Sequence, residues 1–90
     1  MPSVCAHLII SGRVQGVCFR ICTEQEALRL KLTGWVRNLP TGQVETYLEG
    51  EEEKVEKMIE WCHQGPPAAK VKTVEVLWEK PKNFSDFSIV

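Results

Sequence analysis

The sequence predicts an α+β fold in which one antiparallel sheet carries two helices on a single face, in the order β-α-β-β-α-β with a short extra strand at the C-terminus. Three observations support this prediction. Short segments of β-forming residues alternate between apolar and polar positions, two segments place apolar residues at helical spacing, and glycine and proline mark the turns. The 90 residues are enough for one hydrophobic core, so we expect a single domain spanning residues 1–90.

The first strand and the first helix are predicted within residues 4–31. Residues 4–10 (VCAHLII) are rich in β-forming side chains, and residues 19–31 show helical spacing. Alternation along the strand gives it two faces: Ala6, Leu8 and Ile10 on one, and Cys5, His7 and Ile9 on the outward one. The apolar stripe of the helix comprises Phe19, Thr23, Ala27 and Leu30. We therefore expect His7 on a solvent-facing or partly covered surface of the sheet, without a catalytic role.

The second half of the chain supplies the remaining elements. We predict strands at residues 33–38, 43–49, 71–78 and 86–90. Pro40 and Gly42 suit the turn that joins the first two of these strands into a hairpin. Gly50 is expected to end the hairpin, and the glutamates at 51–53 complement the dipole of a following helix that stops at Gly65. The apolar stripe of that helix comprises Val55, Met58, Ile59 and Cys62.

Composition excludes several classes of protein. The formal net charge is −1 and both signs are spread along the chain, whereas a general nucleic-acid binder would carry a basic stripe or tail. No apolar run approaches the roughly 20 residues needed to span a bilayer. The first residues lack the basic region and cleavage pattern of a signal peptide. We therefore expect a cytoplasmic monomer that binds neither nucleic acid nor membrane.

The chain has four cysteines: Cys5, Cys18, Cys22 and Cys62. Four cysteines in a short secreted chain could form two disulfides, but nothing indicates secretion, so we expect reduced thiols. No pair has the C-x-x-C spacing of a redox or zinc site, and we expect neither a metal nor a cofactor. Cys62, on an apolar helix stripe, is expected to face the core.

The stretch from Gly12 to Arg20 (GRVQGVCFR) connects the first strand to the first helix. Gly12 and Gly16 allow backbone angles that other residues avoid, so the loop can turn several amide N–H groups inward as a nest for an anion. The helix that follows adds unpaired amides and the positive end of its dipole. Arg20 adds a planar, permanently charged fork suited to phosphate oxygens. The stretch therefore predicts an oxyanion site.

The predicted topology brings a second polar residue to this loop. In a ferredoxin-like sandwich the first two strands run parallel and the third lies between them. The loop after the first strand and Asn38, at the end of the second, then emerge at the same edge of the sheet, about 10 Å apart. We expect Asn38 to face the anion loop across a gap able to hold a small phosphorylated group.

Two motifs contain this loop and the hairpin: IISGRVQGVCFR and GWVRNLPTGQVETYLEG. As a pair they resemble the two signatures of the acylphosphatase family. The diagnostic positions present are Gly12, Val14, Gln15, Gly16, Val17, Phe19, Arg20, Gly34, Trp35, Asn38, Gly42, Val44 and Gly50. The motifs cover about a third of the chain, and the predicted order of helices and strands agrees with the family along the rest.

The resemblance implies a ferredoxin-like fold and a metal-free hydrolysis of acyl phosphates to a carboxylate and inorganic phosphate. It implies that Arg20 binds the phosphate and that Asn38 orients the attacking water. The phosphate-binding loop would comprise Gln15, Gly16, Val17, Cys18, Phe19 and Arg20. Acetyl phosphate, carbamoyl phosphate and phosphoglycerate anhydrides present the same reacting group, and each remains open as the substrate.

Three alternatives stand beside this hypothesis. A non-enzymatic anion-binding module has the same fold, although such a module has no need of Asn38. A single-stranded RNA-binding domain shares the element order, but it needs exposed aromatic residues on its central strands. A catalytic domain fused to a carbamoyl-phosphate-handling protein would belong to a longer chain.

Cys18 raises a further alternative, because a thiolate in a positive loop could attack phosphorus. Thiol phosphatases place their cysteine at the start of a C-x5-R loop, whereas here only Phe19 separates Cys18 from Arg20. We therefore expect Cys18 to serve loop packing or to be an oxidation-sensitive bystander.

Overall fold

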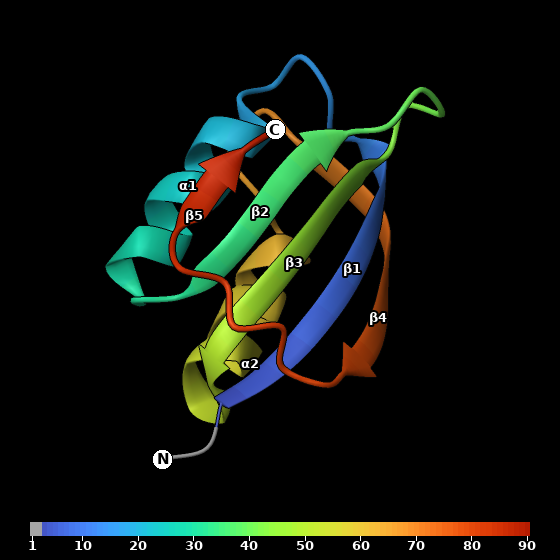
Figure 1. The fold of residues 1–90 in the computed structure, drawn as a ribbon. Helices are drawn as coiled ribbons and strands as arrows, with labels where there is room; N and C mark the ends of the chain where they lie inside the picture. Colours follow the sequence, from blue (N-terminus) through green and yellow to red (C-terminus); the bar gives the residue numbers. More distant parts are fainter. Residues whose placement is uncertain (1–2) are drawn as a thin grey trace.

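The computed structural model describes residues 3–90; the first two residues of the predicted domain lie outside the described residues. Five strands and two helices follow one another in the predicted order (Figure 1). They are β1 (Ser3–Arg13), α1 (Phe19–Arg29), β2 (Thr33–Asn38), β3 (Val44–Glu51), α2 (Glu52–Cys62), β4 (Lys70–Glu79) and β5 (Phe87–Ile89). The predicted α+β fold with an extra C-terminal strand is confirmed.

The strands form one sheet in the order β4-β1-β3-β2-β5. β3 pairs antiparallel with both β1 and β2, so β1 and β2 run parallel with β3 between them, as predicted. The sheet is antiparallel across four strands only, because β5 pairs parallel with β2. The reason is the route of residues 80–86, which leave β4 at one edge and cross the face of the sheet to the opposite edge (Figure 1).

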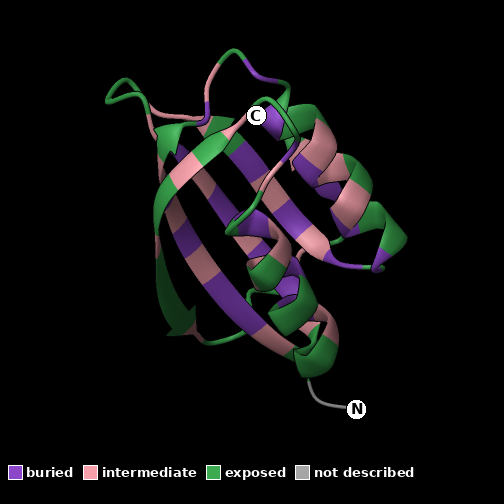
Figure 2. Cartoon of the chain, turned by 180° about the vertical axis from the view of Figure 1, so that it is seen from behind, coloured by how far each residue is buried: buried purple, intermediate pink, exposed green. Residues whose placement is uncertain are grey.

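Both helices pack on one face of the sheet and cover the core. Figure 2 shows this side, where buried strand residues lie beneath α1 and α2. The predicted inward residues are buried, with the exception of Ile59, which is partly buried. The confirmed set is Ala6, Leu8, Ile10, Phe19, Thr23, Ala27, Leu30, Val55, Met58 and Cys62. In β3, Val44, Thr46 and Leu48 are buried as well. The helical and strand periodicities of the sequence therefore locate the core correctly.

Element ends differ from the predictions where the backbone takes an unusual conformation. Helix α1 ends at Arg29 and not at Lys31, because Lys31 adopts a φ of 59° and the amide of Leu32 turns back to the carbonyl of Ala27. Gly50 does not end β3: it has a φ of 157° and stays in the ladder opposite Val4. A β-carbon at Gly50 would lie 2.6 Å from Leu32 Cδ2, so glycine there serves close packing within the strand.

Cys5 lies on the outward face of β1, as predicted, since it shares that face with His7, but it is fully buried there. Residues 80–86 cross the outer face of the sheet next to it, held by Glu49, the residue paired with Cys5 across the strands. The carboxylate of Glu49 accepts hydrogen bonds from the amides of Asn83 (3.1 Å) and Phe84 (3.2 Å). Burial, and then the charge of Glu49, raise the pKa of the Cys5 thiol. Alternation identifies the face of a residue but not what covers that face.

Replacing Glu49 with alanine should lower the free energy of unfolding by about 2–4 kcal/mol, because two amides lose a charged acceptor. Glu49 is only 4% exposed, so water cannot easily take its place. Urea denaturation measures the change, and Glu51→Ala, at the exposed end of the same strand, is the matched control. Equal stability of the two variants would show that the crossing segment does not depend on Glu49.

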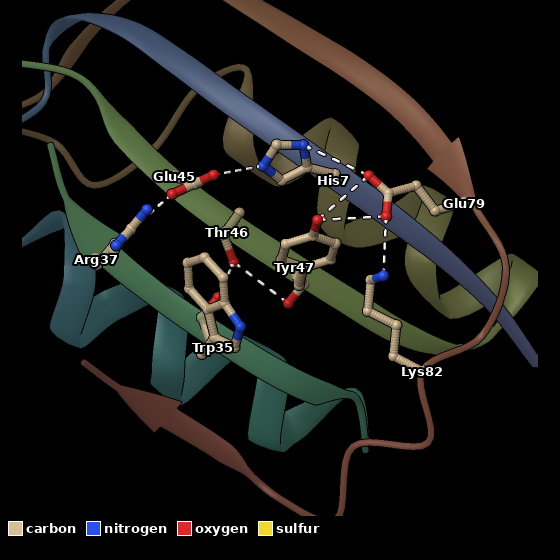
Figure 3. A network of polar contacts seen from close by, with 8 residues as sticks. All are labelled: His7, Trp35, Arg37, Glu45, Thr46, Tyr47, Glu79 and Lys82. Carbon is tan, nitrogen blue, oxygen red and sulfur yellow. Dashed lines mark hydrogen bonds and ion pairs between the residues drawn. The ribbon is translucent and has the colours of Figure 1, made fainter.

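The rest of the outer face carries a network of polar residues (Figure 3). His7 Nε2 lies 2.6 Å from Glu45 and its ring stacks on Tyr47, so the predicted partly covered position of His7 is confirmed. Arg37 Nε donates to the same Glu45 at 2.6 Å. Burial by itself would raise the pKa of Glu45, but the hydrogen bonds from His7 and Arg37 outweigh it and the pKa lies below its usual value. None of His7, Arg37, Glu45 and Tyr47 lines the cavity described below.

Candidate functional site

The end of β1 and the loop that joins it to α1 contain three residues with positive φ. Gly12 has a φ of 124° and Gly16 one of 74°, and Cys18, the residue that caps α1, has a φ of 64°. At Gly12 a β-carbon would lie 2.3 Å from the carbonyl oxygen of Lys70, so only glycine fits there. At Gly16 there is open space, and glycine is favoured there by the backbone angle alone. The loop has the tight conformation that the two glycines predicted.

The backbone of this loop presents unpaired donors. Within residues 3–90, the amides of Gly16, Val17 and Cys18 donate to no other group. Helix α1 begins directly after them at Phe19, so its first amides and the positive end of its dipole lie at the same place. Val17 and Phe19 are buried, and they therefore contribute only their backbone to the loop surface while their side chains anchor it in the core.

Arg20 and Asn38 line one cavity of about 280 Å³. The other lining residues are Val14, Gly16, Cys18, Phe19 and Ile21. Arg20 is exposed and forms no ion pair with any residue between 3 and 90. The strand order therefore brings the loop and the end of β2 to one edge, and the cavity between them has a free cationic fork on one side and a carboxamide on the other.

The side-chain oxygen of Asn38 is buried and accepts no hydrogen bond from the described part of the chain. A buried acceptor without a donor costs about 1–3 kcal/mol, so this oxygen does not stabilise the fold. A half-turn of the carboxamide exchanges its oxygen and nitrogen, which are a hydrogen-bond acceptor and a donor respectively. Asn38 itself lines the cavity that it shares with Arg20.

Gln15 does not line the cavity, and its side chain contacts the β2–β3 turn. Its Nε2 donates to the carbonyl oxygens of Leu39 (2.8 Å) and Gln43 (2.9 Å). Sequence reasoning placed Gln15 in the phosphate loop and missed this contact. No local signal could have indicated it, since the donor and the acceptors lie 24 and 28 positions apart.

Residues 3–90 contain neither a disulfide nor a candidate metal site. All four cysteines of the described chain are free thiols; Cys18 is exposed, Cys22 is half-buried, and Cys5 and Cys62 are buried. Burial raises the pKa of the Cys62 thiol, which makes it unreactive. Among residues 3–90 there is no group of three or more histidine, cysteine, aspartate or glutamate side chains arranged to hold a metal ion. Neither helix of this range is long and apolar enough to cross a membrane.

The fold and the cavity together define a small α+β sandwich whose cavity, at one edge of the sheet, is lined by loop residues, Arg20 and Asn38. The sequence model of the acylphosphatase family matches residues 6–89. An acylphosphatase of Thermococcus kodakarensis is 54% identical over 90 residues, which cover 100% of this chain and 99% of that protein.

Solved structures agree with this match. An acylphosphatase from Coxiella burnetii superposes with a TM-score of 0.95 at 40% identity, over 98% of this chain and 93% of that one. An acylphosphatase from Bacillus subtilis superposes with a TM-score of 0.94 at 38% identity, over 97% and 98% of the two chains. The chain belongs to the acylphosphatase family. It is accordingly a hydrolase that acts on acyl phosphates.

Proposed function

We propose that the chain hydrolyses acyl phosphates to a carboxylate and inorganic phosphate without a metal ion, with water as the nucleophile. The phosphate is held by the loop from Gln15 to Arg20 and by the Arg20 side chain, and Asn38 orients the water. One observation carries the proposal: Arg20 and Asn38, from different elements, line the same cavity beside the unpaired amides of the loop.

The chemistry needs little beyond this cavity. A carboxylate is a good leaving group that needs no protonation, so the reaction requires no general acid. Phosphoryl transfer is promoted chiefly by positioning and by stabilising the charge on the equatorial oxygens. Donors fixed in place before the reaction supply that stabilisation, and here they are the loop amides and the guanidinium of Arg20.

Asn38 can accept a hydrogen bond from water and orient it, but it cannot remove a proton at neutral pH. A phosphate oxygen of the substrate is the proton acceptor in this proposal. The proton passes from the water to this oxygen as the new bond from the water to phosphorus forms, and the bond from phosphorus to the leaving carboxylate breaks. The asparagine therefore contributes orientation, and the substrate itself completes the proton transfer.

The alternative of a non-enzymatic anion-binding module would use the loop and Arg20 in the same way. It leaves Asn38 unexplained, because an unpaired buried oxygen costs stability and an anion module gains nothing from it. The free thiols suit a reducing compartment, and we propose a cytoplasmic location on that ground.

The test uses benzoyl phosphate and a chelator. The wild-type protein should keep its rate in excess chelator, because the proposed site contains no metal. Cys18→Ala, which preserves the backbone amide of the loop, should also hydrolyse the substrate, because water and not the thiol attacks. Loss of activity on chelation would overturn the metal-free mechanism, and an inactive, folded Cys18→Ala would instead indicate a covalent one.

A further inference from the structure

We propose that Gln15 is a positioning residue for this reaction: its side chain ties the phosphate loop to the β2–β3 turn and thereby sets the place of Asn38 relative to the bound phosphate. The inference rests on the proposed function, because it assumes that Asn38 orients the water. It assigns Gln15 a role through its side chain that is separate from any contact of its backbone with phosphate.

The contact joins the two halves of the site at one point. Gln15 Nε2 donates both of its hydrogens, one to the carbonyl of Leu39 at 2.8 Å and one to the carbonyl of Gln43 at 2.9 Å. Leu39 directly follows Asn38 in the chain, and Gln43 lies opposite it, since the amide of Leu39 donates to the carbonyl of Gln43 at 2.8 Å. The bridge therefore ends next to the backbone that carries the Asn38 side chain.

The turn is also tied to the strand that leads into the loop. Gln43 Nε2 donates to the hydroxyl of Ser11 in β1 at 2.8 Å. The amide of Gly42 closes the turn on the carbonyl of Leu39 at 3.1 Å. Ser11, Gln15 and the turn are thus joined by one continuous set of hydrogen bonds through Gln43.

Gln15 is the loop residue whose side chain hydrogen-bonds to another part of the protein. Among residues 3–90, the two bonds of Gln15 are the only side-chain hydrogen bonds between positions 14–18 and the rest of the protein. Val14 and Val17 anchor the loop by burial, but apolar packing is not directional and does not fix the distance between two polar groups. Gln15 is half-buried and does not line the cavity, so its side chain is placed to act on the turn and not on the substrate.

The expected consequence is on the rate and not on binding. Misplacing a reacting group by about 1 Å can cost on the order of a hundredfold in rate, while a loop that keeps its amides still holds phosphate. Gln15→Ala removes both hydrogen bonds and leaves the amide of residue 15 in place. Its kcat should fall by about 10- to 100-fold, with KM and the inhibition constant of inorganic phosphate changing by less than about threefold.

The decisive experiment is a double-mutant cycle with Asn38→Ala, using benzoyl phosphate. If Gln15 acts by placing Asn38, then Gln15→Ala should change kcat by less than about twofold when Asn38 is already absent. If Gln15→Ala lowered kcat in the Asn38→Ala background by the same factor as in the wild-type protein, the inference would be overturned and the proposed function would stand. An Asn38→Ala variant with wild-type kcat would overturn the proposed function itself, and the inference with it.

Two further variants separate positioning from folding. Gln15→Met has a similar length but no donor, and it should show the same selective loss of kcat while it preserves the packing of the loop. Gln25→Ala, an exposed glutamine on α1, is the matched control and should behave as wild type. A Gln15→Met variant that is folded and has wild-type kcat would contradict the inference.

Discussion

Replacing Arg20 with glutamine should lower kcat/KM for benzoyl phosphate by about a hundredfold to a thousandfold. The side chain is exposed at the mouth of the cavity and, within residues 3–90, has no ion-pair partner that would compete with a phosphate. Glutamine keeps an amide donor at about the position of the arginine Nε but loses the charge and the planar fork that match two phosphate oxygens. Both substrate binding and the charge that develops in the transition state should therefore suffer.

Steady-state kinetics with a chelator present measures this change, together with the inhibition constant of inorganic phosphate, which should rise. The matched control is Arg13→Gln, which removes an exposed arginine at the end of β1 that does not line the cavity. Equal rates for wild type and Arg20→Gln would contradict the assignment of the phosphate site. A loss of the same size in Arg13→Gln would show that general electrostatic attraction, and not a specific fork, accounts for the effect.

Replacing Asn38 with alanine should lower kcat by about a hundredfold to a thousandfold and leave KM nearly unchanged. In the proposed mechanism Arg20 and the loop amides already stabilise the charge of the phosphate, and the Asn38 carboxamide adds nothing to that stabilisation. In that mechanism Asn38 orients the water, which matters only on the way to the transition state. The same substitution should leave the free energy of unfolding unchanged or raise it by about 1 kcal/mol, because it removes a buried acceptor that has no donor within residues 3–90.

The combination of lost rate and retained stability distinguishes a functional residue from a structural one. Thr33→Ala, at the other end of β2, is the control for substitution in this strand. Asn38→Asp keeps the shape but adds a negative charge near the phosphate, so its KM should rise in addition to the loss of kcat. An Asn38→Ala variant with a large rise in KM and an unchanged kcat would contradict the role proposed for this residue.

Much of the site could be predicted because its geometry follows from strand order. Once β1 and β2 are parallel with β3 between them, the loop after β1 and the residue at position 38 have to emerge at one edge. The cavity shared by Arg20 and Asn38 is the consequence. What the prediction lacked were the contacts that hold these parts together, since Gln15 and its acceptors meet only after the hairpin has formed.

The sequence by itself determined the helices and strands and the residues that face the core. It also determined the glycines at positions 12 and 16 and the resemblance to a family. Periodicity, backbone angles and motifs are local properties, so a sequence can show them directly. Only the tertiary structure decided the parallel pairing of β5 and the burial of Cys5, the link from Gln15 to the turn and the unpaired oxygen of Asn38. Each of these depends on where a distant segment lies in space. A local pattern carries no information about that position, and the packing of the whole chain settles it.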